Sequence, residues 1–354
     1  MTASRSVAGL VGAALVGAVV VSTAAGPEAL PARDVIATGV PRPLELVVDG
    51  PSLVVVSPGD RGGVAAEIYR IPLRAADPPI DLSRQPRVRL PLADTGATTL
   101  GSLAIDPGSG ELYLGEENGT RIWRLSTDEQ LTLYATGLRR LAGGTVLAFD
   151  RLGRLVLVDF ADPYLSESEE RPPPGLDQFR DEDYRGPLVY RLVLDRSVRL
   201  PRRFRYLAPL FPAGWGARAR GTVLPYFTSV VPLANDDLLL LTSSGDLYRL
   251  RGDGTLTLFT QLPRGQYNRT HMAAASDGTL FVSGGFQVAN VFQVSPSGAV
   301  STLARAMADP EGIALDDRGY LYVAESSLHR IVRLATGHAA GLAEPAVDKP
   351  GGSP

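Results

Sequence analysis

A short phrase recurs along this chain. Near the C-terminal end it reads Asp309-Pro-Glu-Gly-Ile-Ala-Leu-Asp-Asp-Arg-Gly-Tyr-Leu-Tyr-Val-Ala-Glu325, followed by Arg330-Ile-Val-Arg-Leu334. Upstream, Leu100-Gly-Ser-Leu-Ala-Ile-Asp-Pro-Gly-Ser-Gly-Glu-Leu-Tyr-Leu114 is followed by Arg121-Ile-Trp-Arg-Leu125. Apolar runs bounded by Gly- and Asp-containing turns are typical of short antiparallel strands. A repeat of fixed period limits the chain to repeat architectures before any single residue is considered.

The Leu-Tyr-Val element of the repeat can be placed six times: at Leu53–Val56, Leu112–Leu114, Leu155–Val158, Leu238–Leu241, Leu280–Val282 and Leu321–Val323. The steps from Leu112 to Leu155 and from Leu280 to Leu321 both fall within the roughly 40–45 residues of a four-stranded propeller blade. The sequence therefore predicts an all-β, six-bladed β-propeller over residues 33–335.

One interval of the repeat is longer than the others. The step from Leu155 to Leu239 is about twice the length of a blade, so it could hold a seventh one. We reject that alternative because Pro187–Leu194 supplies a third strand for the blade that begins at Leu155. The excess is assigned to two insertions, at about 160–186 and 211–226. The first is rich in Asp and Glu, and it is predicted to be a solvated loop or, less simply, a lid or partner-binding segment.

The two ends of the repeat region complement each other. The last blade lacks an outermost strand after Leu334, and Val35-Ile-Ala-Thr-Gly-Val40 closely copies the outer strand Leu133-Tyr-Ala-Thr-Gly-Leu138. We therefore expect the N-terminal strand to complete the last blade. Such closure leaves no unpaired sheet edge between the first and last blades.

The N-terminal segment at 1–25 is predicted to be a signal peptide. Arg5 precedes an apolar run, Val7–Val21, and small residues follow at Ser22–Gly26. The alternative is an uncleaved membrane anchor, because the run approaches the length that spans a bilayer. We expect a secreted, periplasmic or cell-envelope protein that is free of the membrane after cleavage. The tail at 341–354 is rich in Gly, Pro and Ala and is predicted to be disordered.

Composition excludes several classes of function. The formal net charge is -3, which argues against a general nucleic-acid binder. The chain has no cysteine, which excludes disulfides, thiolate metal sites and cysteine nucleophiles. A small-molecule ligand or an extracellular protein or glycan remains as the expected partner of a monomeric chain.

The phrase Pro-x-Gly-Ile-Ala-x-Asp-x-x-Gly-x-Leu-Tyr-Val-Ala-Glu, followed by Arg-Ile, resembles an NHL repeat. After the signal peptide, the whole chain resembles secreted six-bladed propellers of the NHL/TolB-like superfamily. That superfamily includes the senescence-marker/gluconolactonase group and strictosidine-synthase-like proteins. The resemblance implies the fold more strongly than it implies any one function.

The resemblance also implies a ligand site on the propeller axis. The site would be built from the start of each innermost strand and from the loop after each second strand. The innermost slots hold Leu44, Gly101, Thr145, Ser229, His271 and Glu311, and the loop slots hold Ser57, Glu116, Asp159, Ser243, Ser283 and Glu325. From these slots we select Asp159, Glu116, Thr145 and Ser229 as candidate ligand-binding residues.

Glu311 and His271 are the candidate catalytic residues. A carboxylate and an imidazole in neighbouring axial slots could act as an acid–base pair or share a divalent ion. The alternative is structural: Glu311 would cap backbone N–H groups at the strand entry, and His271 would be a neutral buried residue with its hydrogen bonds satisfied.

The two named groups of the superfamily imply different roles for Glu311. The gluconolactonase group holds a divalent metal through carboxylate and amide side chains in the innermost slots, where this chain has Glu311 alone. Glu45 lies one residue out of register, and such a slip points a side chain to the other face of a strand. Glu311 is therefore the one candidate ligand for Ca²⁺ or Mg²⁺ in these slots. Strictosidine-synthase-like enzymes use a single Glu in the last blade as a base, and Glu311 matches that role by position.

The sequence thus predicts an exported propeller that binds a small organic or sugar-derived ligand on its axis. If it is an enzyme, the resemblance implies a gluconolactonase- or strictosidine-synthase-like hydrolase or lyase. The alternative is a non-catalytic NHL-type scaffold that binds protein or glycan.

Overall fold

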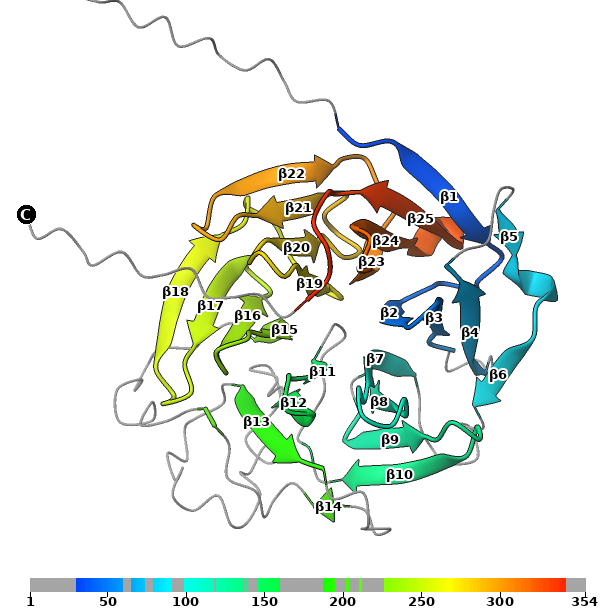
Figure 1. Ribbon diagram of the computed structural model, residues 1–354, viewed down its shortest axis with the longest axis horizontal. Coiled ribbons are helices and arrows are strands. Elements are labelled where there is room, and N and C mark those ends of the chain that lie inside the picture. The colour runs from blue at the N-terminus through cyan, green and yellow to red at the C-terminus, as the bar shows by residue number, and fades with distance from the viewer. Residues whose placement is uncertain are drawn as a thin grey trace, which may run out of the picture. The chain divides into compact units, whose positions relative to one another are not determined.

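The computed structural model describes residues 30–59, 65–73, 79–90, 99–117, 119–136, 138, 146–159, 187–194, 202–203, 210–211 and 226–341. Within these residues the regular structure is β, apart from short 3-10 turns. Six sheets surround a common axis, and each forms one blade of a propeller (Figure 1). The predicted all-β, six-bladed fold is confirmed.

In blades one to five the strands run outward from the axis in chain order. Blade one contains β2 (Glu45–Asp49), β3 (Ser52–Ser57), β4 (Ala66–Pro72) and β6 (Arg87–Leu90). Blade two contains β7 (Leu100–Ile105), β8 (Leu112–Glu116), β9 (Arg121–Leu125) and β10 (Leu131–Thr136), with β14 (Arg202–Arg203) at its edge. Blade three contains β11 (Leu147–Phe149), β12 (Arg154–Asp159) and β13 (Leu188–Val193).

Blades four and five follow the same order, and blade six adds two strands from early in the chain outside its own three. Blade four contains β15 (Phe227–Pro232), β16 (Leu238–Thr242), β17 (Asp246–Leu250) and β18 (Leu256–Gln261). Blade five contains β19 (Met272–Ala274), β20 (Leu280–Ser283), β21 (Val291–Val294) and β22 (Val300–Ala304). Blade six contains β23 (Pro310–Leu315), β24 (Tyr320–Glu325) and β25 (Arg330–Ala335), with β1 (Arg33–Thr38) and β5 (Ile80–Asp81) outside them.

Strands from both ends of the described chain share blade six. β1 pairs antiparallel with β25, so that Arg33 lies opposite Leu334 and Thr38 lies opposite Arg330. The Arg333 guanidinium also donates to the Asp34 carboxylate at 2.9 Å. In blade six, two neighbouring strands, β1 and β25, therefore come from nearly opposite ends of the described chain.

The aspartates that end the innermost strands shape the turns of the repeat. In blade six, Oδ1 of Asp316 accepts hydrogen bonds from the backbone N–H groups of Arg318 and Tyr320 at 3.0 and 2.8 Å. In blade three, Asp150 accepts in the same way from Leu152 and Arg154, both at 3.0 Å. The repeated Asp is thus explained by turn formation, because its carboxylate satisfies backbone donors that the strands leave unpaired.

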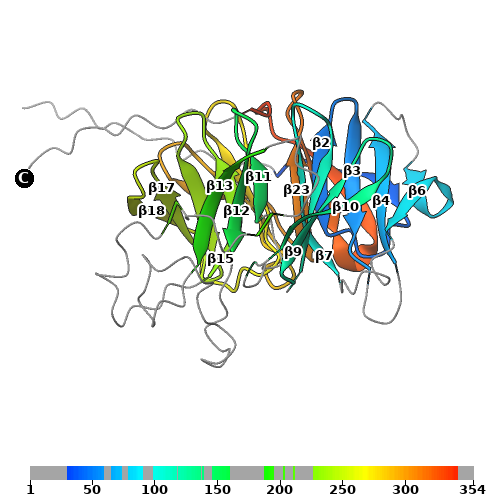
Figure 2. The ribbon, with the colours of Figure 1, turned by 90° about the horizontal axis from the view of Figure 1, so that it is seen from below.

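The core lies between the blades. Strand β12 is buried from Leu155 to Asp159, because neighbouring blades cover both of its faces. Tyr113 of blade two packs edge-to-face on Phe149 of blade three, with ring centroids 5.3 Å apart. Figure 2 shows the blades edge on, with β11 and β23 running along the axis. The start of each innermost strand consequently lies at one end of a central channel.

Several predicted segments lie outside the described residues and stay predictions. They are the signal peptide at 1–25, the acidic insertion at 160–186, residues 212–225 of the second insertion and the tail from 342. Among the residues that the structure describes, no helix is long and apolar enough to span a membrane.

Candidate functional site

The innermost strands begin irregularly at one end of the channel. The pairing register shifts between Leu100 and Ser102 in β7, between Phe227 and Ser229 in β15, and between Pro310 and Ile313 in β23. Such bulges redirect side chains and are common beside functional sites. In β23 the bulge contains Glu311 and Gly312. This explains how a charged residue interrupts an apolar strand without facing the core.

His271 comes just before β19 in the chain. Its side chain is fully buried, and Nδ1 lies 2.9 Å from the backbone oxygen of Glu311. Because a carbonyl oxygen only accepts, Nδ1 carries the proton and donates. The His271 backbone N–H also donates to Ser283 Oγ at 2.8 Å, and that hydroxyl in turn donates to the Glu311 carbonyl. His271 and Ser283 therefore fix the bulge from which Glu311 projects.

The other ring nitrogen of His271 faces a carboxylate from blade one. Nε2 is in ion-pair contact with Oε2 of Glu45, which is 2% exposed. The predicted catalytic pair is therefore rearranged. His271 contacts Glu311 through the backbone of that residue, and its carboxylate partner is Glu45.

The expectation that Glu45 faces away from these slots is wrong. Strand β2 pairs with β3 without the register shift seen in β7, β15 and β23, so its alternation differs by one residue from theirs. Gly312 lets blade six lie close to Glu45. A Cβ at this position would lie 3.0 Å from the Glu45 Cα atom and 2.5 Å from the Leu44 carbonyl oxygen. Only a residue without a side chain permits blades six and one to approach this closely.

The Glu45–His271 pair retains a proton. Burial raises the pKa of Glu45 above its ordinary value, although the neighbouring His271 lowers it in part. Burial lowers the pKa of His271, but the charge and hydrogen bond of Glu45 and the contacts with Glu311 together outweigh it, and the pKa of His271 is raised overall. Both shifts favour the protonated form, because two groups that share a proton avoid a lone charge in the interior.

The Glu311 carboxyl has a different environment. It is 3% exposed, its Oε1 lies 4.0 Å from Nη1 of Arg269, and its buried Oε2 has no hydrogen-bond partner in the described part of the chain. Burial raises the pKa of Glu311 to about 7, while the positive charges of Arg269, His271 and Arg42 act in the opposite direction. Glu311 is thus able to take up and release a proton near neutral pH.

Arg269 joins two blades that face each other across the axis. It comes just before His271 in blade five, and its guanidinium donates to both carboxylate oxygens of Glu117 in blade two, at 2.7 and 3.1 Å. Blades two and five lie on opposite sides of the ring (Figure 1). The sequence did not single out this pair, because 152 residues separate its members.

Glu116, a predicted ligand-binding residue, has structural partners. Its Oε1 accepts a hydrogen bond from Trp123 Nε1 at 2.7 Å and forms an ion pair with Arg121 Nε at 2.8 Å, and both contacts tie β8 to β9. The equivalent Glu325 in blade six binds Arg330 at 2.6 Å. The repeated Glu and Arg are therefore explained by blade structure, and a role for Glu116 in ligand binding stays a prediction.

The other three predicted ligand-binding residues differ in their surroundings. Ser229 is fully buried in β15, and its hydroxyl has no hydrogen-bond partner among the described residues. Asp159 ends β12, is fully buried and lies opposite Leu188 of β13. Thr145 lies outside the described residues.

The donors present do not fit a divalent cation. Within the described residues, no three His, Asp or Glu side chains are grouped so that they could hold a metal ion. Glu45 is engaged by His271, and Glu311 faces the guanidinium of Arg269, whose charge opposes a second cation. The geometry therefore gives no support to Glu311 as a ligand for Ca²⁺ or Mg²⁺.

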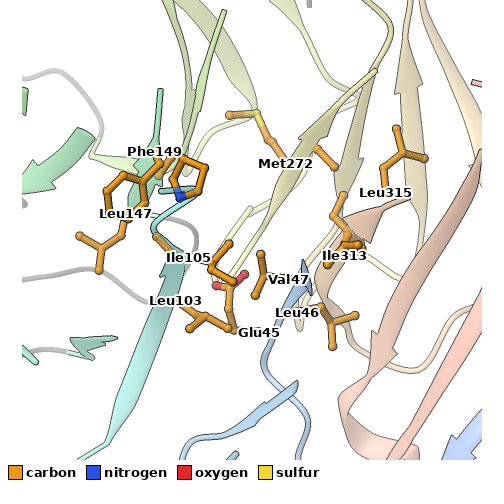
Figure 3. Close-up of a pocket in the computed structure, with 16 residues that line it drawn as sticks. Glu45, Leu46, Val47, Leu103, Ile105, Leu147, Phe149, Met272, Ile313 and Leu315 are labelled. Atoms are coloured by element: carbon orange, nitrogen blue, oxygen red, sulfur yellow. The ribbon is translucent and has the colours of Figure 1, made fainter. Parts of the chain in front are cut away.

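Beyond Glu45 the channel opens into an apolar cavity of about 330 Å³. Its walls come from the innermost strands of five blades, β2, β7, β11, β19 and β23 (Figure 3). Glu45 is the one ionisable residue among the 16 that line it. The channel is therefore polar around Glu311 and apolar beyond Glu45.

Comparison with known proteins supports the fold. No protein-family model matches the chain, and no curated protein matches it in sequence. A putative gluconolactonase is similar in structure, with 13% identity over 89% of this chain and 94% of that chain and a TM-score of 0.54. The calcium-binding protein regucalcin from Agrobacterium tumefaciens C58 has 12% identity over 89% and 97% of the two chains and a TM-score of 0.54.

Virginiamycin B lyase from Staphylococcus aureus has 13% identity over 90% of this chain and 89% of that chain, with a TM-score of 0.47. At the identities of the gluconolactonase and regucalcin matches, a structural likeness shows a shared six-bladed propeller fold. A shared fold does not by itself show a shared function.

Proposed function

We propose that the protein binds a small organic or sugar-derived lactone or ester at the polar end of the propeller axis and hydrolyses it by acid–base catalysis at Glu311. One observation carries the proposal. Glu311 is a buried carboxyl with an unpartnered Oε2, and the Arg269 cation lies beside its other oxygen. Burial raises the pKa of Glu311 to about 7, which suits a group that both accepts and donates a proton at neutral pH.

The reaction can be written with these two side chains. The Glu311 carboxylate accepts a proton from a water molecule whose oxygen attacks the acyl carbon. The carbonyl electron pair moves onto oxygen, and Nη1 of Arg269 stabilises the resulting negative charge. Collapse of the intermediate breaks the acyl C–O bond, and Glu311 returns the proton to the departing alkoxide. One water is consumed, and an acid and an alcohol are formed.

His271 serves this reaction as a positioning residue. Its Nδ1–H donates to the Glu311 carbonyl at 2.9 Å, so it holds the bulge that aims the carboxyl. Its Nε2 is occupied by Glu45, so its imidazole is not free to act on a substrate.

Hydrolysis of a panel of aliphatic and sugar-derived lactones by the purified chain tests the proposal. The Glu311→Gln variant should lose at least about 100-fold in kcat, the usual contribution of general acid–base catalysis. Glu129→Gln is the matched control, because Glu129 is an exposed turn residue, and it should keep full activity. Equal turnover by Glu311→Gln and the unmodified chain would remove Glu311 from the mechanism. If no lactone or ester is hydrolysed, the non-catalytic scaffold is the better proposal.

We also propose that the chain is exported. The proposal rests on the apolar run Val7–Val21 and the small residues Ser22–Gly26. Expression of the full chain in a secreting bacterial host should give a mature protein that begins near Gly26. N-terminal sequencing of the cell-envelope and medium fractions measures this. An intact Met1 on membrane-bound protein would favour the uncleaved anchor.

A further inference from the structure

The apolar cavity beyond Glu45 is separate from the site around Glu311. Its lining residues include Leu103, Phe149, Met272 and Ile313, and Glu311 is not among them. In Figure 3 the Glu45 carboxylate lies among the side chains of Val47, Leu103 and Ile105. A volume of about 330 Å³ falls within the range of small-molecule pockets, which begins near 300 Å³. The cavity thus has apolar walls and one polar point.

The Glu45 carboxylate can accept one more hydrogen bond. A carboxylate offers about four acceptor positions. The Glu45 carboxylate is engaged by the His271 side chain and by the backbone N–H groups of Leu46 and Leu103. Its Oε2 is the oxygen in contact with Nε2 of His271, so these three donors take three of the four acceptor positions. One acceptor position therefore remains for a donor that enters from the cavity.

The charge of the Glu45–His271 pair determines which ligand group can bind beside it. Glu45 and His271 already neutralise each other, so a neutral ligand leaves their balance intact. A ligand ammonium group would have to displace the proton that the pair holds or remain as an extra buried charge. A ligand carboxylate would lie against the Glu45 carboxylate without a counterion, since none of the described residues that line the cavity is cationic.

We propose that this cavity is a second ligand site, which takes a neutral, mainly apolar molecule with one hydroxyl group. The hydroxyl donates a hydrogen bond to the Glu45 carboxylate, and the apolar body fills the space between the innermost strands. This inference does not depend on the proposed hydrolysis, because the hydroxyl compound is bound and no bond is made or broken.

Titration calorimetry with three probes of equal length tests the charge selection. We expect 1-hexanol to bind, and hexylamine and hexanoate to bind at least tenfold more weakly. Along the series from 1-butanol to 1-hexanol, affinity should rise roughly fourfold per methylene, the gain expected when each CH₂ is buried. Hexanoate binding as tightly as 1-hexanol, or no binding of any alcohol, would overturn the proposal.

Two variants locate the binding. Ala148→Leu adds bulk to the wall provided by β11 and should abolish 1-hexanol binding, whereas Glu45→Leu should weaken it about tenfold by removing the acceptor. Thermal unfolding shows whether each variant is folded, and Ala148→Leu keeps the test valid if Glu45→Leu is not. Glu311→Gln is the control and should bind 1-hexanol normally. Unchanged binding by Ala148→Leu would place the alcohol elsewhere and refute the assignment.

Discussion

Substituting Gly312 by alanine tests the close approach of blades six and one. The added Cβ would lie 2.5 Å from the Leu44 carbonyl oxygen and 3.0 Å from the Glu45 Cα atom. Both atoms belong to the backbone, so a side-chain rotation cannot relieve the contact, and β2 has to move away from β23. Overpacking of this kind costs about 1–3 kcal/mol of unfolding free energy. Domains of 150–250 residues lose about 2–4 °C in Tm per kcal/mol, so we expect a loss of roughly 2–12 °C.

Gly252 provides the matched control. A Cβ at Gly252 would meet no heavy atom within 4 Å, and Gly252 lies in an exposed turn. Gly252→Ala should therefore change the unfolding free energy by less than about 0.5 kcal/mol. The measurement is urea unfolding followed by tryptophan fluorescence, with calorimetric Tm values beside it. If Gly312→Ala is no less stable than Gly252→Ala, the argument for close packing at Glu45 fails.

Three further predictions concern the buried charges. The pKa of Glu311 is raised from 4.5 to about 7, so between these pH values the folded state binds more protons than the unfolded state. The free energy of unfolding that this group contributes therefore falls as pH rises from 4.5 to about 7. Glu311→Gln should therefore stabilise the protein by roughly 1–3 kcal/mol at pH 8 and have little effect at pH 4, which urea unfolding at the two pH values measures. His271→Leu leaves Glu45 buried without its partner and should cost about 3–5 kcal/mol, whereas the double variant Glu45→Leu/His271→Leu should recover most of it; equal stability of the single and double variants would contradict the pairing. Glu116→Gln removes a charged acceptor from Trp123 and Arg121 and should lower stability by about 1.5–3 kcal/mol, with Glu129→Gln as the neutral comparison.

The fold could be predicted from the sequence because its signals are local. Each blade repeats an apolar strand, an Asp turn and a Leu-Tyr-Val strand, and residues such as Asp316 act only on their immediate neighbours. The prominence of Glu311 could also be predicted, since none of its repeat equivalents is acidic.

The pairings at the axis could not be predicted in the same way. Glu45 faces His271 because β2 lacks a bulge that three other innermost strands have. The residues of β2 give no sequence signal for this difference. Arg269 finds Glu117 only after the ring is assembled. These contacts depend on how the blades are placed around the axis, which the repeat pattern leaves open.

The bond between Arg269 and Glu117 has a mechanical consequence. A ring of six blades can become oval through small rotations at each blade interface. Because this ion pair connects opposite blades, lengthening the ring along that diameter would have to break two charge-assisted hydrogen bonds. Flattening along the perpendicular diameter meets the same resistance, since the two deformations occur together. We therefore expect the low-frequency motions of the ring to be damped at this end of the axis and to be largest at the apolar end, where the described residues provide no such link.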